Sequence, residues 1–314
     1  MQRDALFKMR LCAPFCKGLK LFTQKKLKTK ADYNTSLKIP LSSEYYLILV
    51  HHNPFSHMNK SKQRKPTVSQ PVRIVEKKPI PTEALMLHGL PDVGLVGLIA
   101  TSYIISELDL EEIAYVDSDL LPPVVVLHEG LPHAPLRIYG GKGVIAAISE
   151  MAIPAAGIHS VMRKLIDWAQ SKKVKMVLSI GGMPLENRQN IKEPKVFCAA
   201  SKTDLLDLLD KKGLNILKEG YMVGPQALTM RYCTERKLSA IAFLAQSFYN
   251  YPDPEAAAVA INEVAKIAEL KIDVSKLLEK GEEIRLRARD IMKRTQRELT
   301  HMKKSQEYDL PLYV

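Results

Sequence analysis

The three residues that end the sequence, Leu312, Tyr313 and Val314, carry groups suited to recognition by another protein. The carboxylate of Val314 can pair with a buried lysine, the phenol of Tyr313 can donate one hydrogen bond, and Leu312 can fill an apolar notch. Capture of a C-terminal carboxylate is a recurrent mode of recognition. We expect these residues to form a binding tail. Because about one chain in a hundred ends this way by chance, the rest of the chain has to support that interpretation.

A glycine-rich stretch from Gly89 to Gly97 lies between an expected strand and an expected helix, where a phosphate-binding loop would lie. It contains neither Gly-x-Gly-x-x-Gly nor Gly-Lys followed by Ser or Thr, so it lacks both common signatures of nucleotide binding. Two interpretations stay open: Gly94 and Gly97 let the helix approach the sheet closely, or the stretch binds a nucleotide. We favour close packing.

A second loop, Gly181 to Gln189, follows the expected strand 174–180, whose sequence looks the most buried. Loops at the carboxyl ends of strands commonly bind ligands in open α/β sheets. Glu186 and Arg188 could therefore serve a small-molecule site, or they could form a polar interface between subunits. We favour the interface.

Glu150, His159 and Asp167 are expected near one junction between a strand and a helix. A lone histidine at a helix start is more often structural than a base, and no nucleophile, base and acid come together in the sequence. Cys198 and Cys233 have no histidine partner close by, so we expect inert buried thiols. We predict no catalytic residues, no cofactor and no metal site, and thus a protein that is not an enzyme.

Almost all of the net charge of +12 lies in the N-terminal part of the chain. Residues 1–65 contain 14 Lys or Arg and three Asp or Glu, whereas residues 66–314 contain 32 and 31. We favour the interpretation that residues 1–57 are upstream sequence from a wrongly assigned start codon and that the protein starts at Met58. The alternative is that they form a basic arm that binds nucleic acid or an acidic partner. The near-neutral remainder argues against a nucleic-acid-binding protein.

A zinc site in the N-terminal part has little support. Cys12, Cys16, His51, His52 and His57 supply the right atoms, but their spacing matches no standard zinc finger. Four cysteines make no disulfide framework, and the apolar runs are too short for a spanning helix or a secretory signal. We therefore expect a cytoplasmic protein without a membrane partner.

Strand-like and helix-like segments alternate between residues 80 and 273, which predicts a layered α/β/α fold around a mixed sheet. The expected strands are 84–88, 113–116, 124–127, 136–139, 143–149, 174–180 and 241–244. The expected helices are 92–108, with Asp92 as its cap, then 154–172, 204–212, 226–236 and 255–271.

The last forty residues predict a helical arm. Leu277, Ile284 and Ile291 recur every seven residues between Val274 and Gln306, with Gly281 as a weak point. About thirty helical residues reach roughly 45 Å, and Pro311 cannot continue a helix. The expected domains are a basic extension over 1–65, an α/β domain over 66–273, and an arm with its tail over 274–314.

The order and spacing of several motifs resemble the archaeal branch of the proteasome assembly chaperone family. They are Gly-Leu-Pro-Asp-Val-Gly-Leu-Val-Gly at 89–97, Tyr-Val-Asp-Ser at 115–118 with Pro122-Pro123, Gly-Met-Pro at 182–184, and Gly-Pro at 224–225. The final Leu312-Tyr313-Val314 looks like the hydrophobic-tyrosine-any motif of proteasome activators, whose tails enter pockets between α-subunits of the core proteasome. Residues 1–65 lie outside the resemblance.

The resemblance implies a non-enzymatic domain, related in fold to nucleoside phosphorylases, that forms a ring-like homo-oligomer. It implies an ATP-independent assembly chaperone or activator that docks on the α-ring of the core proteasome through its tail. The alternative is an enzyme of the nucleoside phosphorylase type, with a site near residues 89–97 and 181–189.

Overall fold

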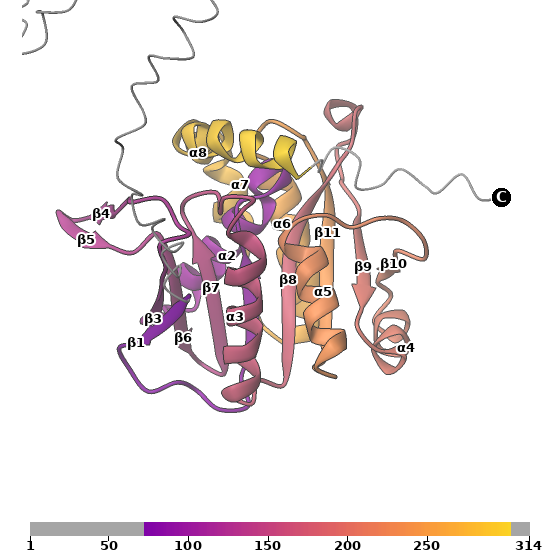
Figure 1. Cartoon of the computed structure of the whole chain (residues 1–314). Coiled ribbons are helices and arrows are strands. Elements are labelled where there is room, and N and C mark those ends of the chain that lie inside the picture. Colours follow the sequence, from indigo (N-terminus) through magenta and orange to yellow (C-terminus); the bar gives the residue numbers. More distant parts are fainter. Residues whose placement is uncertain (1–71, 303–314) are drawn as a thin grey trace, which may run out of the picture. The chain divides into compact units, whose positions relative to one another are not determined.

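A computed structural model describes residues 72–302 and centres on one mixed sheet of nine strands, in the order β1-β3-β6-β7-β2-β8-β11-β9-β10 (Figure 1). The strands are β1 (Arg73–Glu76), β2 (Leu85–Gly89), β3 (Glu111–Asp117), β6 (Leu136–Gly141), β7 (Val144–Ser149), β8 (Met176–Pro184), β9 (Val196–Ala200), β10 (Asn215–Ile216) and β11 (Ala240–Ser247). The predicted α/β class with a mixed sheet is confirmed.

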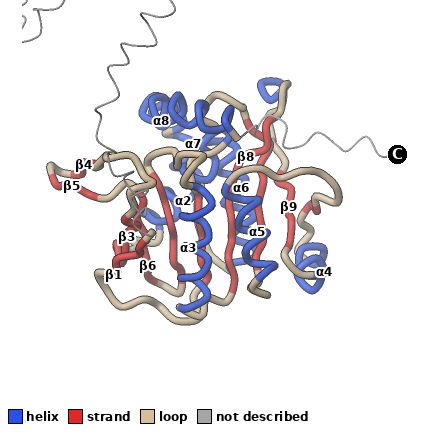
Figure 2. Tube along the Cα trace, in the orientation of Figure 1, coloured by secondary structure: helices blue, strands red, loops and turns tan. Residues whose placement is uncertain are grey.

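Four parallel strands, β7, β2, β8 and β11, form the middle of the sheet (Figure 2). On one side the pairs β1–β3, β3–β6 and β6–β7 are antiparallel, and on the other side β9 runs antiparallel to β11. The middle strands are covered on both faces, which is why they read as continuous apolar runs in the sequence. The short strands β9 and β10, which the sequence did not predict, extend the other edge.

Helices cover both faces of the sheet. They are α2 (Val96–Glu107), α3 (Ile158–Ser171), α4 (Thr203–Lys211), α5 (Pro225–Glu235), α6 (Pro254–Ala268), α7 (Ser275–Glu279) and α8 (Gly281–His301), with short 3-10 turns η1 (Val93–Leu95) and η2 (Arg188–Asn190). Helices α3 and α5 lie on one face, and α2 and α6 lie on the other (Figure 1).

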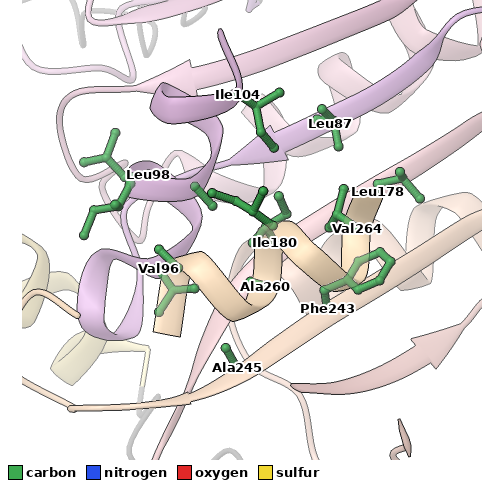
Figure 3. Close-up of a cluster of buried hydrophobic side chains, with 14 of the residues drawn as sticks. Leu87, Val96, Leu98, Ile104, Leu178, Ile180, Phe243, Ala245, Ala260 and Val264 are labelled. Carbon is green, nitrogen blue, oxygen red and sulfur yellow. The ribbon is translucent and has the colours of Figure 1, made fainter. Parts of the chain in front are cut away.

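Each face has its own apolar core. In the core beneath α2 and α6, Leu87, Leu178 and Phe243 of the sheet meet Val96 and Val264 of the helices (Figure 3). The other core lies beneath α3 and α5. Helix α3 is amphipathic because its apolar side chains recur every three or four residues, so one stripe faces the sheet.

The C-terminal region does not form the single helical arm that the sequence predicted from residue 274 onward. It forms two helices that meet at Lys280, next to the predicted weak point Gly281. Neither helix projects from the described body as an arm. Leu277 of α7 and Ala288, Met292 and Leu299 of α8 are buried in the same core as α2 and α6. Arg285 of α8 also pairs with Glu255 at the start of α6, at 2.5 Å.

Some expectations fall outside the described residues. These are the nature of residues 1–57, the candidate zinc ligands Cys12, Cys16, His51, His52 and His57, and the tail Leu312, Tyr313 and Val314. Within residues 72–302, none of the helices has the length and apolar character needed to cross a membrane.

Candidate functional site

The glycine-rich stretch after β2 packs against the sheet. A Cβ added to Gly97 would lie 2.3 Å from the carbonyl oxygen of Ile180, and one added to Gly182 would lie 2.2 Å from that of Val93. Both distances are far below any normal contact, so only glycine lets η1 and α2 lie this close to β8. The close-packing interpretation of the loop is therefore confirmed.

The start of α2 also differs from the prediction. Asp92 does not cap α2, because the helix begins only at Val96, after the 3-10 turn η1. Gly94 at φ 59° and Leu95 at φ 52° adopt left-handed conformations there, which the apolar pattern of the sequence does not reveal. The Asp92 carboxylate is fully buried next to Gly181 rather than exposed at a helix end.

The crevice at the carboxyl ends of β2 and β8 is closed. Gln226, the second residue of α5, fills the space over Gly181 and donates a hydrogen bond of 3.3 Å to the Ile180 carbonyl. Helix α8 covers the crevice from outside, where Glu298 accepts a hydrogen bond of 2.8 Å from the Ala155 amide. The cavity left between α8, Leu90 and Pro225 has a volume of about 10 Å³, enough for about one water molecule.

Arg188 is an internal structural residue. Its guanidinium forms a two-pronged ion pair with Asp253, with Nε to Oδ2 at 2.8 Å and Nη2 to Oδ1 at 3.0 Å. It also donates to the Ile191 carbonyl at 2.6 Å and lies over the Phe248 ring. Since Arg188 is buried within its own chain, both sequence-based roles for it were wrong, the ligand site and the subunit interface alike. Glu186 in the same loop is exposed.

Glu150, His159 and Asp167 do not form one cluster. Glu150 pairs with Arg137, the ring of His159 lies 3.0 Å from the Tyr232 hydroxyl, and Asp167 pairs with Arg236 at 2.6 Å. The expectation of a shared junction was wrong because each side chain has a different partner, and Asp167 lies eight residues beyond His159 along α3.

Cys198 and Cys233 are free thiols, and burial raises the pKa of each to about 12. A thiol with so high a pKa is not a nucleophile near neutral pH. Both residues lie in apolar cores, as the sequence interpretation expected.

A polar cluster that the sequence analysis missed lies on the sheet beside α2. Its centre is Arg137 of β6, only 4 % exposed, which forms an ion pair with Glu150 and lies 3.9 Å from Glu112. His128 Nε2 lies 2.8 Å from Arg137 Nη2 and 3.1 Å from Glu150, and His133 Nδ1 lies 3.1 Å from Glu112. We call these five residues the Arg137 cluster.

The Arg137 cluster lines an open cleft of about 380 Å³, whose other wall includes Ser102 and Ile105 of α2. Burial and the nearby Arg137 lower the pKa of His128, so its neutral ring accepts the hydrogen bond from the guanidinium. The positive charge of Arg137 compensates part of the negative charge of Glu112 and Glu150. Its guanidinium at the centre of the cluster also disfavours a metal cation there. No group of three or more His, Cys, Asp or Glu suited to a metal occurs within residues 72–302.

The two histidines of the Arg137 cluster belong to a separate β-hairpin. Strands β4 (Val126–His128) and β5 (Leu131–His133) pair only with each other, and the β4–β5 hairpin extends beyond the edge of the main sheet (Figure 1). The strand expected at 124–127 therefore does not join the main sheet. Sequence spacing could not reveal the cluster, since its members come from β3, β4, β5, β6 and the loop after β7.

The hairpin also exposes apolar side chains. Val125, Leu127 and Leu131 are 62 %, 66 % and 64 % exposed. At its base lies a shallow groove of about 660 Å³, lined by Tyr115, Leu121, four prolines and their neighbours. We call this the base groove.

Three similarities to known proteins involve most of the described fold. The chain is 27 % identical over 244 residues to an uncharacterized protein of Methanocaldococcus jannaschii. This alignment covers 77 % of the present chain and 98 % of the relative. The structure is similar to PbaA of Pyrococcus furiosus, an archaeal homolog of proteasome-assembly chaperone, at a TM-score of 0.68 and 29 % identity over 72 % of this chain and 99 % of PbaA.

The fold is also similar to that of PbaB of Pyrococcus furiosus, an archaeal proteasome activator. The TM-score is 0.60 at 22 % identity, over 70 % of this chain and 98 % of PbaB. Residues 86–292 match the PAC2 family, and they span the sheet from β2 through most of α8. The chain therefore belongs to the PAC2 family.

Proposed function

We propose that this protein is an ATP-independent proteasome assembly chaperone or activator that self-assembles and docks on the α-ring of the core proteasome. The observation that carries the proposal is the PAC2 match over residues 86–292, together with the similarity to PbaA. The sequence contains no Walker motif, so ATP hydrolysis of the usual kind does not drive its action.

The closed crevice at the strand ends supports a role other than catalysis. In α/β sheets that act as enzymes, ligands bind outside the carboxyl ends of the strands. Here Gln226 and α8 leave about 10 Å³ at that place, far below the several hundred that a nucleoside requires. We therefore rank the nucleoside phosphorylase alternative second. It predicts phosphate-dependent release of base from nucleosides by the purified protein, and such release would favour the enzyme.

The proposed docking group is the tail Leu312, Tyr313 and the carboxylate of Val314. Val314 lies twelve residues after Met302, so the tail can reach at most about 40 Å from the body. Each tail makes few contacts, but several tails on one oligomer raise one another's effective concentration at the α-ring. We place the protein in the cytoplasm with its target, and the near-neutral charge of residues 66–314 supports neither a nucleic-acid nor a membrane partner.

The test is binding of the full chain to isolated α-rings by surface plasmon resonance at fixed salt. Tyr313→Ala removes a large apolar ring and one hydrogen bond, so we expect affinity per tail to fall about 30-fold. One extra residue after Val314 displaces the carboxylate and harms binding almost as much. Lys293→Ala on α8 is the control, since this exposed side chain contributes little. If Tyr313→Ala and the extended tail both bind like the parent chain, docking through the tail is wrong.

A further inference from the structure

We propose that the β4–β5 hairpin is the surface through which one copy of this chain binds a second copy. The inference rests on the proposed self-assembly and names the surface responsible for it. The hairpin and the base groove form one continuous region, because Val124 and Val125 lead from the groove into β4.

The apolar character of the hairpin requires a cover. Val125, Leu127 and Leu131 lie within seven residues of one another, and each is more than 60 % exposed. The cross-strand pairs Leu127–Pro132 and His128–Leu131 put Val125 and Leu127 on one face of the hairpin and Leu131 on the other. Val125 also lines the base groove, so the face with Leu127 continues the groove surface. Scattered exposed leucines are normal on a protein surface, but a contiguous apolar surface of this kind marks an interaction site. A two-stranded hairpin is also only marginally stable by itself in water, and it gains stability when another surface packs against it.

The Arg137 cluster holds the hairpin in position before any partner arrives. His128 accepts a hydrogen bond from Arg137 of β6, and the His133 ring contacts Glu112 of β3, so both strands of the hairpin are attached to the main sheet. Arg137 is almost fully buried at the centre of these contacts. A surface that is fixed in advance loses little conformational entropy on binding, so the polar cluster favours docking of the apolar hairpin.

The base groove identifies the occupant as a second copy. Its apolar side, with Tyr115, Leu121 and four prolines, complements the exposed apolar side chains of the hairpin, and its polar side holds Asp117, Ser118 and Asp119. Since the exposed face of the hairpin and the groove adjoin on one chain, a two-fold axis between two copies can bring this region of each copy against the same region of the other. The groove has fourteen lining residues between Tyr115 and Pro135, and Leu127 and Leu131 add two more, somewhat fewer than the roughly twenty residues per partner of a standard interface.

The experiment compares three full-length proteins by sedimentation velocity at micromolar concentration: the parent chain, Leu127→Asp with Leu131→Asp, and Leu286→Asp. Leu286 of α8 is 69 % exposed, which matches Leu127, so it controls for a charge placed on an exposed leucine. We expect the parent chain and Leu286→Asp to form the same oligomer and the hairpin variant to fall to a smaller species. Equal melting temperatures exclude unfolding as the cause.

Amide hydrogen exchange of the parent chain provides the second readout. Residues 126–133 should be protected at high protein concentration and should lose protection on dilution, whereas α3 should not change. The inference would be overturned if the hairpin variant formed an oligomer of the same mass as the parent chain, or if exchange of the hairpin amides did not depend on protein concentration. Either result would leave self-assembly intact. A monomeric parent chain would overturn self-assembly as well. If the hairpin variant kept the oligomer mass of the parent chain but no longer bound α-rings, the hairpin would be a surface for the proteasome instead.

Discussion

Arg188 and Asp253 are joined by two parallel hydrogen bonds, 2.8 and 3.0 Å long, in the interior of the protein. The pair connects the loop after β8 to the first turn of α6, where Asp253 also accepts the Ala256 amide at 3.0 Å as the helix cap. Because neither side chain reaches solvent, each depends on the other to compensate its charge.

Asp253→Asn should therefore lower the free energy of unfolding by about 3–5 kcal/mol, since it leaves the Arg188 guanidinium buried without its counterion. Urea unfolding measures the loss. Glu235→Gln breaks the exposed Arg231–Glu235 pair on α5 and serves as the control, with a nearly unchanged midpoint. Equal midpoints for the two variants would contradict the structural role of the buried pair.

His88 makes stability depend on pH. Burial lowers its pKa from 6.5 to about 4, and its Nε2 lies 2.7 Å from the Thr229 hydroxyl. In the unfolded chain His88 binds a proton below about pH 6.5, whereas in the folded chain it binds one only below about pH 4. Between these pH values protonation favours the unfolded chain, so the folded state is most stable above pH 6.5. Stability should fall by about 3 kcal/mol as the pH drops through this range.

The check is chemical unfolding at several pH values between 7 and 4, with His88→Gln beside the parent chain. Glutamine does not titrate, so the variant should be less stable at pH 7 but should show a shallower slope. Parallel slopes would mean that other groups cause the dependence.

Gly97→Ala tests the close approach of α2 to the sheet. Alanine favours helices by about 1 kcal/mol over glycine, yet the added Cβ would overlap the Ile180 carbonyl. We expect a net loss of about 1–3 kcal/mol, as for an overpacked core. Gly281→Ala at the start of α8 is the matched control, because its nearest neighbours lie 3.9 Å away. It should gain about 0.5 kcal/mol, and the same sign for both variants would refute the packing argument.

Leu299→Ala tests whether α8 packs on the body. Leu299 is fully buried, so its truncation should cost about 2–5 kcal/mol through lost burial and a new cavity. Leu286→Ala on the same helix is exposed and should change the melting temperature little. If Leu299→Ala were equally silent, α8 would be a free arm in solution.

The elements that the sequence predicted well are those whose pattern is local. Strands β2, β7, β8 and β11 are buried on both faces, and a continuous apolar run between turns indicates such a strand without further information. Helices α4, α5 and α6 were predicted within about three residues of their observed bounds. The short strand β10 has two residues, too few for any pattern.

The C-terminal helix was interpreted less well for a physical reason. The buried residues of α8 include Ala288, Met292, Thr295 and Leu299, at spacings of four, three and four, as for any helix with one apolar stripe. The stripe shows that something covers the helix, but not whether that is a partner or its own domain. The Arg137 cluster was invisible for a related reason, since only the order β3-β6-β7 and the position of the separate β4–β5 hairpin bring its members together.

The position of α8 has a consequence for synthesis of the protein. A ribosome makes the sheet first and α8 only afterwards, so a nascent chain that stops before Gly281 leaves Leu90 and Ile153 uncovered at the strand ends. Apolar surface exposed in an incompletely folded chain promotes aggregation, and chaperones and proteases act on such chains. The helix that completes the fold also directly precedes the tail, so a chain whose strand ends are covered has already been translated almost as far as the residues proposed to reach the proteasome.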